Sequence, residues 1–285
     1  MTIAHEPGRQ LRLTDPPAAD GPRYRVLGPL EVWQGERLLD VGGPQQRALL
    51  AVLLLNANRV VATDRLIEYL WGPHAPQTAR TLLQGCISQL RRVLPSAEAS
   101  AGEQPLVTRA PGYVLNVAAD ELDLLRFERL AKAAADVADA ERRARLLAAA
   151  VGYWSGPVLD GQDLPGCSDE IAELEERRSA ALEERIAIDL SLCAHAGLVV
   201  ELKAEVRSHP LRERLWALLI AALYGLDRQA EALATFLELR DSLVDQLGIE
   251  PSSTLRELHR QVLAGTHPGD LVVPVANDRD LRRTG

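Results

Sequence analysis

The chain has 285 residues, about twice the length of a typical domain, so two domains are expected. Hydrophobic residues make up 47% and charged residues 25%, a balance that excludes a wholly disordered or collagen-like chain. Aromatic residues are only 4%, whereas alanine, leucine, glutamate and arginine are abundant, which disfavours an all-β fold. The composition therefore predicts a mainly α protein.

The chain contains no segment that predicts export or membrane insertion. Its first twenty residues mix charged residues with three prolines and lack an apolar core, so a secretory signal is not expected. The longest apolar stretch, residues 48–55, is much shorter than the roughly 20 residues that cross a bilayer. Cys86, Cys167 and Cys193 form no Cys-x-x-Cys pair, which is typical of packing residues in a reducing compartment. We expect a cytoplasmic, nucleoid-associated protein without membrane contact.

The two halves of the chain differ in charge, although the whole chain carries a net charge of -8. Residues 23–117 contain ten arginines and seven acidic residues, whereas residues 120–264 contain 17 basic and 27 acidic residues. Every basic side chain of the first half is a guanidinium, which suits phosphates and guanine edges. The asymmetry indicates a polyanionic partner for the first half. A GC-rich genome that favours arginine codons also explains the arginine content.

The predicted elements of residues 23–117 follow the order of a winged helix-turn-helix domain. Hydrophobic patterning and turn residues predict a strand at 24–32 with a break at Gly28-Pro29, and a short partner strand at 37–41. They also predict helices at 44–56, 63–71 and 78–94, and a hairpin of 106–108 with 113–117. Pro44 suits a first helical turn, and Thr63 and Thr78 suit the N-caps of the second and third helices. We therefore predict an α+β winged-helix domain over 23–117.

The third helix has one apolar and one polar face. Its apolar stripe consists of Ala79, Leu83, Ile87, Leu90 and Leu94. Its polar face consists of Thr81, Gln84, Ser88, Arg91 and Arg92, with Arg80 at the N-terminal shoulder. An exposed surface without a partner is the plain alternative for such a face, and only its winged-helix context favours nucleic acid.

Residues 120–264 are almost purely helical, with short breaks that predict about seven paired helices. Such pairs form stacks of helical hairpins, and the Ala232-x-x-x-Phe236 spacing is similar to part of a tetratricopeptide repeat. Ordinary bundle packing accounts for the same residues. Residues 1–22 and 265–285 lack periodicity and are predicted to be flexible tails.

In a winged helix, the third helix enters the major groove, where glutamine pairs with adenine and arginine with guanine. Thr81, Gln84 and Ser88 are spaced for base contacts, and Arg91 and Arg92 for phosphates at the edge of the groove. Arg47 is a second phosphate candidate, and Arg109 at the hairpin tip is either a minor-groove contact or a solvated turn residue. The candidate DNA-binding residues are Arg47, Thr78, Arg80, Thr81, Gln84, Ser88, Arg91, Arg92 and Arg109.

Motifs in both halves resemble the Streptomyces antibiotic regulatory protein family. In the first half they are residues 26–30 (VLGPL), 43–50 (GPQQRALL), 64–67 (DRLI), 70–72 (LWG), 78–82 (TARTL), 87–92 (ISQLRR) and 112–113 (GY). In the second half they are residues 124–130, 209–215 (HPLRERL), 225–233 and 247–251 (LGIEP).

The resemblance spans roughly residues 23–264. It implies an OmpR-type winged helix at 23–117 and a tetratricopeptide-like bacterial transcriptional activation domain at 120–264. It also implies binding to direct repeats in double-stranded promoter DNA of antibiotic biosynthetic genes and recruitment of RNA polymerase holoenzyme, including its σ subunit. A departure is Gly85-Cys86 in the middle of the third helix, where the family usually has larger residues. Glycine costs about 1 kcal/mol in a helix interior relative to alanine, so either the helix tolerates it or the backbone approaches DNA closely at this position. The resemblance therefore does not define which bases are read.

No catalysis, cofactor or metal is expected. The chain contains no G-x-x-x-x-G-K-[ST] segment, which predicts a small, ATP-independent member of the family. The six histidines are dispersed, so the sequence contains no readable metal or triad spacing.

Our hypothesis is that two protomers bind successive repeats head to tail as a homodimer, with arginines supplying affinity and the third helix supplying choice of site. Repression stays possible, because operator position helps to decide the outcome. A rival hypothesis treats the helical half as a scaffold for a peptide or small ligand.

Overall fold

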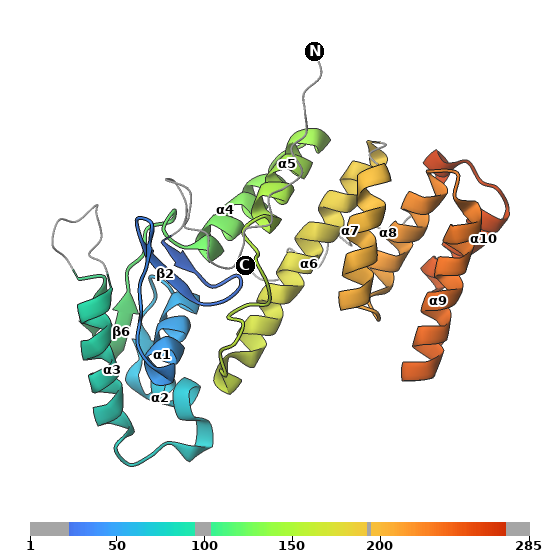
Figure 1. Cartoon of the computed structure of the whole chain (residues 1–285). Helices are drawn as coiled ribbons and strands as arrows, with labels where there is room; N and C mark the ends of the chain where they lie inside the picture. Colours follow the sequence, from blue (N-terminus) through green and yellow to red (C-terminus); the bar gives the residue numbers. More distant parts are fainter. Residues whose placement is uncertain (1–22, 95–103, 193–194, 272–285) are drawn as a thin grey trace. The chain divides into compact units, whose positions relative to one another are not determined.

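The computed structural model describes residues 23–94, 104–192 and 195–271 (Figure 1). The chain forms two compact units, the first from Met1–Lys132 and Ala149–Arg178, the second from Ala133–Ala148 and Ser179–Gly285. These units do not follow the sequence-based limits 23–117 and 120–264, because the first unit also takes in residues beyond 120. The predicted limits remain a division drawn from sequence.

The first unit begins with a small antiparallel sheet of three strands, β1 (Tyr24–Arg25), β2 (Glu31–Gln34) and β3 (Arg37–Leu38). Tyr24 lies opposite Val32, and Trp33 lies opposite Leu38. The stretch predicted over 24–32 forms two strands, β1 and β2, because the chain bends at the predicted Gly28-Pro29 break.

Three helices and a second sheet follow. The helices are α1 (Pro44–Leu55), α2 (Thr63–Trp71) and α3 (Ala79–Val93), with the short 3-10 turn η1 (Gly72–His74) between the last two. The sheet has the order β4-β6-β5, from β4 (Val61–Ala62), β5 (Leu106–Arg109) and β6 (Gly112–Leu115). Figure 1 shows α3 beside this sheet. This order confirms the predicted winged helix, while β4 was not predicted.

The core of the helical trio is built from leucines. In α1 every residue from Leu49 to Leu54 is fully buried, so this helix is covered on all sides. In α3 Leu83 and Leu90 are fully buried because their spacing places them on one face of the helix. The whole predicted stripe of the third helix, down to Leu94, is buried. Burial of side chains of this size contributes about 1.5 to 3 kcal/mol each.

Gly112 allows β6 to lie tightly against β4. A Cβ atom at this position would lie 1.9 Å from the carbonyl oxygen of Val61, which is closer than any side chain permits. Ala62 is its register partner, and the neighbouring pair joins Val61 to Tyr113. The glycine therefore fixes the position of the hairpin relative to the helices.

A buried carboxylate anchors the segment that follows β1 to the helical segment that follows the hairpin. Asp123 begins α4 (Asp123–Ala135) and is 1% exposed. Its oxygens accept hydrogen bonds from the backbone N–H groups of Val26, Leu27 and Leu124, at 2.7 to 3.0 Å. This bonding joins residues almost a hundred positions apart within the first unit.

The same strand segment also pairs with the loop before α6 (Ser168–Ser191). The backbone N–H of Ser155 donates to Leu27 O at 2.8 Å, and that of Leu159 donates to Val26 O at 2.9 Å. Gly28 has φ +151°, and a Cβ there would lie 2.0 Å from Ser155 Oγ. Glycine is therefore needed where the two backbones approach.

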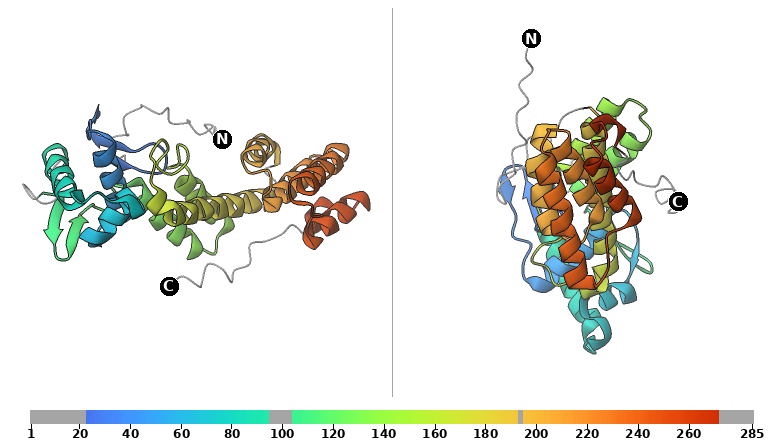
Figure 2. Two further views of the ribbon diagram at one scale, coloured as in Figure 1. Left: turned by 90° about the horizontal axis from the view of Figure 1, so that it is seen from below. Right: turned by 90° about the vertical axis from the view of Figure 1, so that its right-hand side faces the viewer.

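The second unit contains a stack of helices, α7 (His195–Ser208), α8 (Glu213–Tyr224), α9 (Gln229–Leu247) and α10 (Ser253–Leu263). Helix α8 lies between α7 and α9 (Figure 1 and the left view of Figure 2), and its residues from Leu215 to Tyr224 are all buried. With α4, α5 (Ala140–Val151) and α6, the described part of 120–264 contains seven α-helices, as predicted. The mainly α class with a tetratricopeptide-like second part is confirmed.

The predicted tails lie largely outside the described residues. This holds for 1–22 and for 272–285. Residues 265–271 of the predicted C-terminal tail are attached to the fold, because the Tyr224 hydroxyl donates to Thr266 O at 2.7 Å and Pro268–Asp270 forms a 3-10 turn. Cys86 and Cys167 are buried, as expected of packing residues, and Cys193 lies outside the described residues.

Candidate nucleic-acid interface

Helix α3 presents a polar face to solvent. Thr81, Gln84, Ser88 and Arg92 are exposed there, opposite the buried stripe. Thr78 occupies the N-cap position and is exposed, but its side chain forms no capping hydrogen bond. The first turn of α3 carries no acidic residue, so the positive end of the helix dipole is unopposed within the helix itself.

Arg91 does not extend freely from this face. It is half-buried, its Nε donates to Leu106 O at 2.9 Å, and its Nη2 donates to Thr108 Oγ1 at 2.8 Å. These two bonds connect α3 to β5. The role of Arg91 differs from that of its neighbour Arg92, which has no recorded side-chain partner among the described residues. The sequence prediction treated the two arginines alike.

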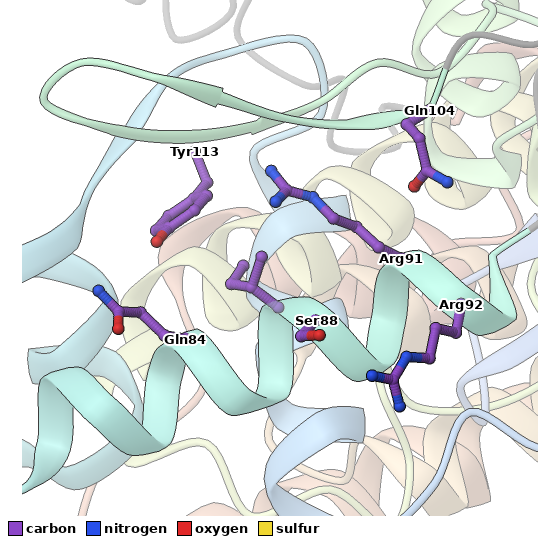
Figure 3. A pocket seen from close by; sticks show the side chains of 7 residues that line it. Gln84, Ser88, Arg91, Arg92, Gln104 and Tyr113 are labelled. Carbon is purple, nitrogen blue, oxygen red and sulfur yellow. The ribbon is translucent and has the colours of Figure 1, made fainter.

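A hollow of about 430 Å³ lies between α3 and the hairpin. Its lining residues are Gln84, Ile87, Ser88, Arg91, Arg92, Gln104 and Tyr113. Figure 3 shows Tyr113 reaching from the hairpin toward α3, Arg91 lying between them, and Arg92 directed away from the hairpin. The hollow is therefore lined by hydrogen-bonding and cationic groups from two elements.

Arg80 forms an ion pair at the start of the helix. Its Nη2 lies 2.6 Å from Asp64 Oδ1 of α2, and the two side chains are 70% and 79% exposed. An ion pair this exposed contributes little to stability, so the guanidinium can exchange the carboxylate for another anion.

The remaining two candidates lie outside α3. Arg109 is exposed at the end of β5, at the tip of the hairpin opposite Gly112. Arg47, in the first turn of α1, is half-buried and its Nη2 donates to Leu30 O at 3.0 Å. One side of the Arg47 guanidinium is thus occupied by a hydrogen bond within the fold. That Arg47 contacts a phosphate stays a prediction.

Sequence reasoning missed Gln104 and Tyr113 as members of this surface. Tyr113 lies opposite Thr108 in the hairpin register, which places it on the side that faces α3. The Gly-Tyr pair at 112–113 was recognised as a motif, but nothing in the sequence indicated that its ring reaches the third helix.

A second groove lies within the second unit, among α7, α8 and α9. It encloses about 480 Å³ over a floor that includes Val206, Trp216 and Leu219. Lys203 and Arg207 of α7 line one side, and Glu231 and Glu238 of α9 line the other. Such a groove can accept an extended peptide or a small molecule.

The described ranges contain neither a cluster of metal-ligating side chains nor a helix that could span a membrane. No group of three or more histidine, cysteine, aspartate or glutamate side chains there is arranged to hold a metal ion. Within the same ranges, every helix is too short or too polar to span a bilayer.

The fold and this surface define a class, the transcription regulators that combine a winged helix with a helical domain. The family model "Transcriptional regulatory protein, C terminal" matches residues 41–115. The family model "Bacterial transcriptional activator domain" matches residues 122–263.

Similar proteins agree with this class. The regulatory protein AfsR of Streptomyces griseus is 38% identical over 87% of this chain, which spans about a quarter (25%) of that relative's length. The regulatory protein DnrI of Streptomyces peucetius is 35% identical over 85% of this chain and 92% of its own length. The structure of Mycobacterium tuberculosis EmbR in complex with a low-affinity phosphopeptide matches with a TM-score of 0.77 at 34% identity, covering 85% of this chain and 65% of that one.

The chain belongs to the Streptomyces antibiotic regulatory protein family. This confirms the resemblance seen in the sequence. The relatives are transcriptional regulators, which agrees with the expectation that the chain is not an enzyme.

Proposed function

We propose that this chain is a sequence-specific DNA-binding activator of transcription for a secondary-metabolite gene cluster, and that it acts in the cytoplasm on the nucleoid. The observation that supports this most is the exposed polar face of α3, with Arg92 at one end and Arg80 at the other, beside a hairpin tipped by exposed Arg109. A helix with such a face fits the major groove, and a basic hairpin tip fits the adjacent minor groove.

The roles within this surface divide by chemistry. Thr81, Gln84 and Ser88 carry hydrogen-bonding groups that suit base edges, whereas Arg80, Arg92 and Arg109 carry charge that suits phosphates or a narrow minor groove. Arg91 joins the hairpin to α3, and it is also one of the residues that line the hollow. We infer that Thr78, at the start of the helix, and Arg47 lie at the edge of the same footprint.

We further propose that two protomers occupy direct repeats head to tail as a homodimer and recruit RNA polymerase holoenzyme, with the σ subunit among the contacted parts. One winged helix reads a short site, and a tandem pair doubles the sequence that is read. Family membership supports this architecture.

Footprinting of the full chain on promoters of its own gene neighbourhood, with and without holoenzyme, tests the proposal. We expect protection of two similar half-sites in the same orientation and an extension of the footprint toward the start site when polymerase is added. Protection of a single site, or of inverted half-sites, would contradict the tandem arrangement. Lack of any protection would contradict the function.

The groove of the second unit favours one rival, in which a peptide or small ligand controls the protein. Its apolar floor and charged rims suit such a ligand. Thermal-shift screening of the full chain against metabolites and polymerase subunits, with Arg207→Glu as the groove variant, separates the two. A metabolite that stabilises the wild type but not the variant would favour sensing, whereas stabilisation by polymerase subunits alone would favour recruitment.

A further inference from the structure

Gly85 is an exposed glycine in the middle of α3, and no contact with the described residues requires a glycine at this position. No atom lies within 4 Å of the position that its Cβ would occupy, and its backbone does not adopt the left-handed conformation. Gly112 offers the contrast, because there the carbonyl of Val61 leaves no room for a side chain. Alanine would fit at position 85 and would favour the helix.

The glycine lies on the face that carries the candidate base contacts. Thr81, Gly85, Ser88 and Arg92 follow one another at intervals of four, three and four residues, so they share one side of the helix. At position 85 this row has no side chain, so the row contains a gap where the backbone of α3 is exposed. We call this gap the notch. The row ends in the cationic Arg92, and the hydroxyls of Thr81 and Ser88 flank the glycine. The hollow beside Gln84 adds further polar groups. These groups indicate that the row meets a polar, anionic partner.

We propose that the notch at Gly85 receives the 5-methyl group of a thymine, so that this glycine is a specificity-determining residue. This inference rests on the proposed DNA-binding function. A notch lined by a Cα–H group offers an apolar surface and no hydrogen-bonding side chain, and the thymine methyl is the apolar group on the major-groove edge of the bases. The adjacent hydroxyls of Thr81 and Ser88 are then close enough along the helix to serve neighbouring base edges.

The test compares Gly85→Ala with Gly197→Ala in the full chain. Gly197 is a matched control, since it is exposed within helix α7 and also has no atom within 4 Å of a Cβ. Both substitutions are expected to leave the fold intact and to raise the free energy of unfolding in urea. Gly85→Ala should weaken binding to the footprinted repeat by about tenfold, the scale of one mismatched base pair, and Gly197→Ala should leave it unchanged.

Uracil in place of each thymine of the repeat, one at a time, removes only the methyl group. We expect one position at which this change weakens binding by the wild type but has no further effect on Gly85→Ala. Binding to unrelated DNA should be the same for all three proteins, because the phosphate contacts are unchanged.

Equal affinity of Gly85→Ala and the wild type for the repeat would overturn the inference, as would a uracil scan without such a position. Weaker binding to every sequence together with lower stability would also overturn it, because that pattern indicates a structural defect. If the wild type itself fails to bind the repeat, the proposed function fails, and the inference fails with it.

Discussion

At the scale of single residues, neighbouring arginines of α3 have different roles although both are cationic. Arg91 is held by the hairpin through two hydrogen bonds, whereas Arg92 is exposed. The partner of Arg80 among the described residues is an exposed carboxylate, that of Asp64. A positive charge on α3 therefore does not by itself identify a DNA contact, because a guanidinium that is already bonded within the fold is less available to a phosphate.

Replacing Arg91 or Arg92 by alanine should separate these roles. Arg91→Ala removes both bonds between α3 and the hairpin, so the free energy of unfolding should fall by about 1 to 2 kcal/mol, and DNA affinity should fall with it. Arg92→Ala should lower DNA affinity with little change in stability. Urea denaturation and gel-shift titration measure the two quantities, and equal stability of the two variants would contradict the assignment.

Asp64 competes with DNA for Arg80 on this interpretation. Asp64→Asn removes a carboxylate from the edge of the proposed interface and releases the guanidinium, so DNA affinity should rise by about two- to fivefold at moderate salt. Asp241→Asn, an exposed aspartate of α9, is the control with the same change in net charge. Unchanged or weaker binding by Asp64→Asn would show that Arg80 does not face the DNA.

The buried Asp123 makes stability depend on pH. Burial raises the pKa of its carboxyl from 3.8 to about 7, although the N–H groups of Leu27, Val26 and Leu124 and the charge of Arg25 act in the opposite direction. Because the pKa of this carboxyl is higher in the folded than in the unfolded protein, the folded protein binds the proton more tightly than the unfolded protein does. Its contribution to stability is therefore full below pH 4 and is lost as the pH rises through 7.

The free energy of unfolding of the wild type relative to Asp123→Asn should accordingly fall between about pH 4 and pH 7, by up to about 4 kcal/mol. The difference between the two proteins isolates this residue, since the other titrating groups are common to both. Urea denaturation at intervals across this range measures it. A difference that grows with pH would contradict the raised pKa.

At the scale of elements, the long helices and their buried faces could be predicted, because periodicity over three or more turns is a strong signal. Helix α1 begins at Pro44, as predicted, and all five stripe positions of the third helix are buried. Strand β4 has only two residues, Val61 and Ala62, which is too short for any alternation to be read. It forms because Gly112 lets β6 approach.

The predicted caps illustrate the same limit. Thr63 is the first residue of α2, not its N-cap, and its hydroxyl donates to Pro111 O at 3.2 Å instead.

The part of the candidate surface that lies on α3 could be predicted, because it follows from the polar face of a single helix. The second half of this surface, from Gln104 and Tyr113, depends on how the hairpin packs, which no local pattern contains.

At the scale of the whole molecule, the chain combines a net charge of -8 with a proposed polyanionic partner. This is possible because the charges are segregated, with the excess of acidic residues in 120–264 and with Arg80, Arg92 and Arg109 exposed in the first half. Association should therefore depend on a local field that salt screens, and net charge should matter less than its placement.

The most direct test of DNA binding through α3 and the hairpin is a gel-shift titration of the footprinted repeat over a range of salt concentrations. Contact with about five phosphates per protomer predicts a slope of log affinity against log salt near -4 to -5. Arg92→Ala should make the slope shallower by about one, while Arg142→Ala, an exposed arginine of α5, should leave it unchanged. A flat response to salt, or equal effects of the two substitutions, would contradict the account.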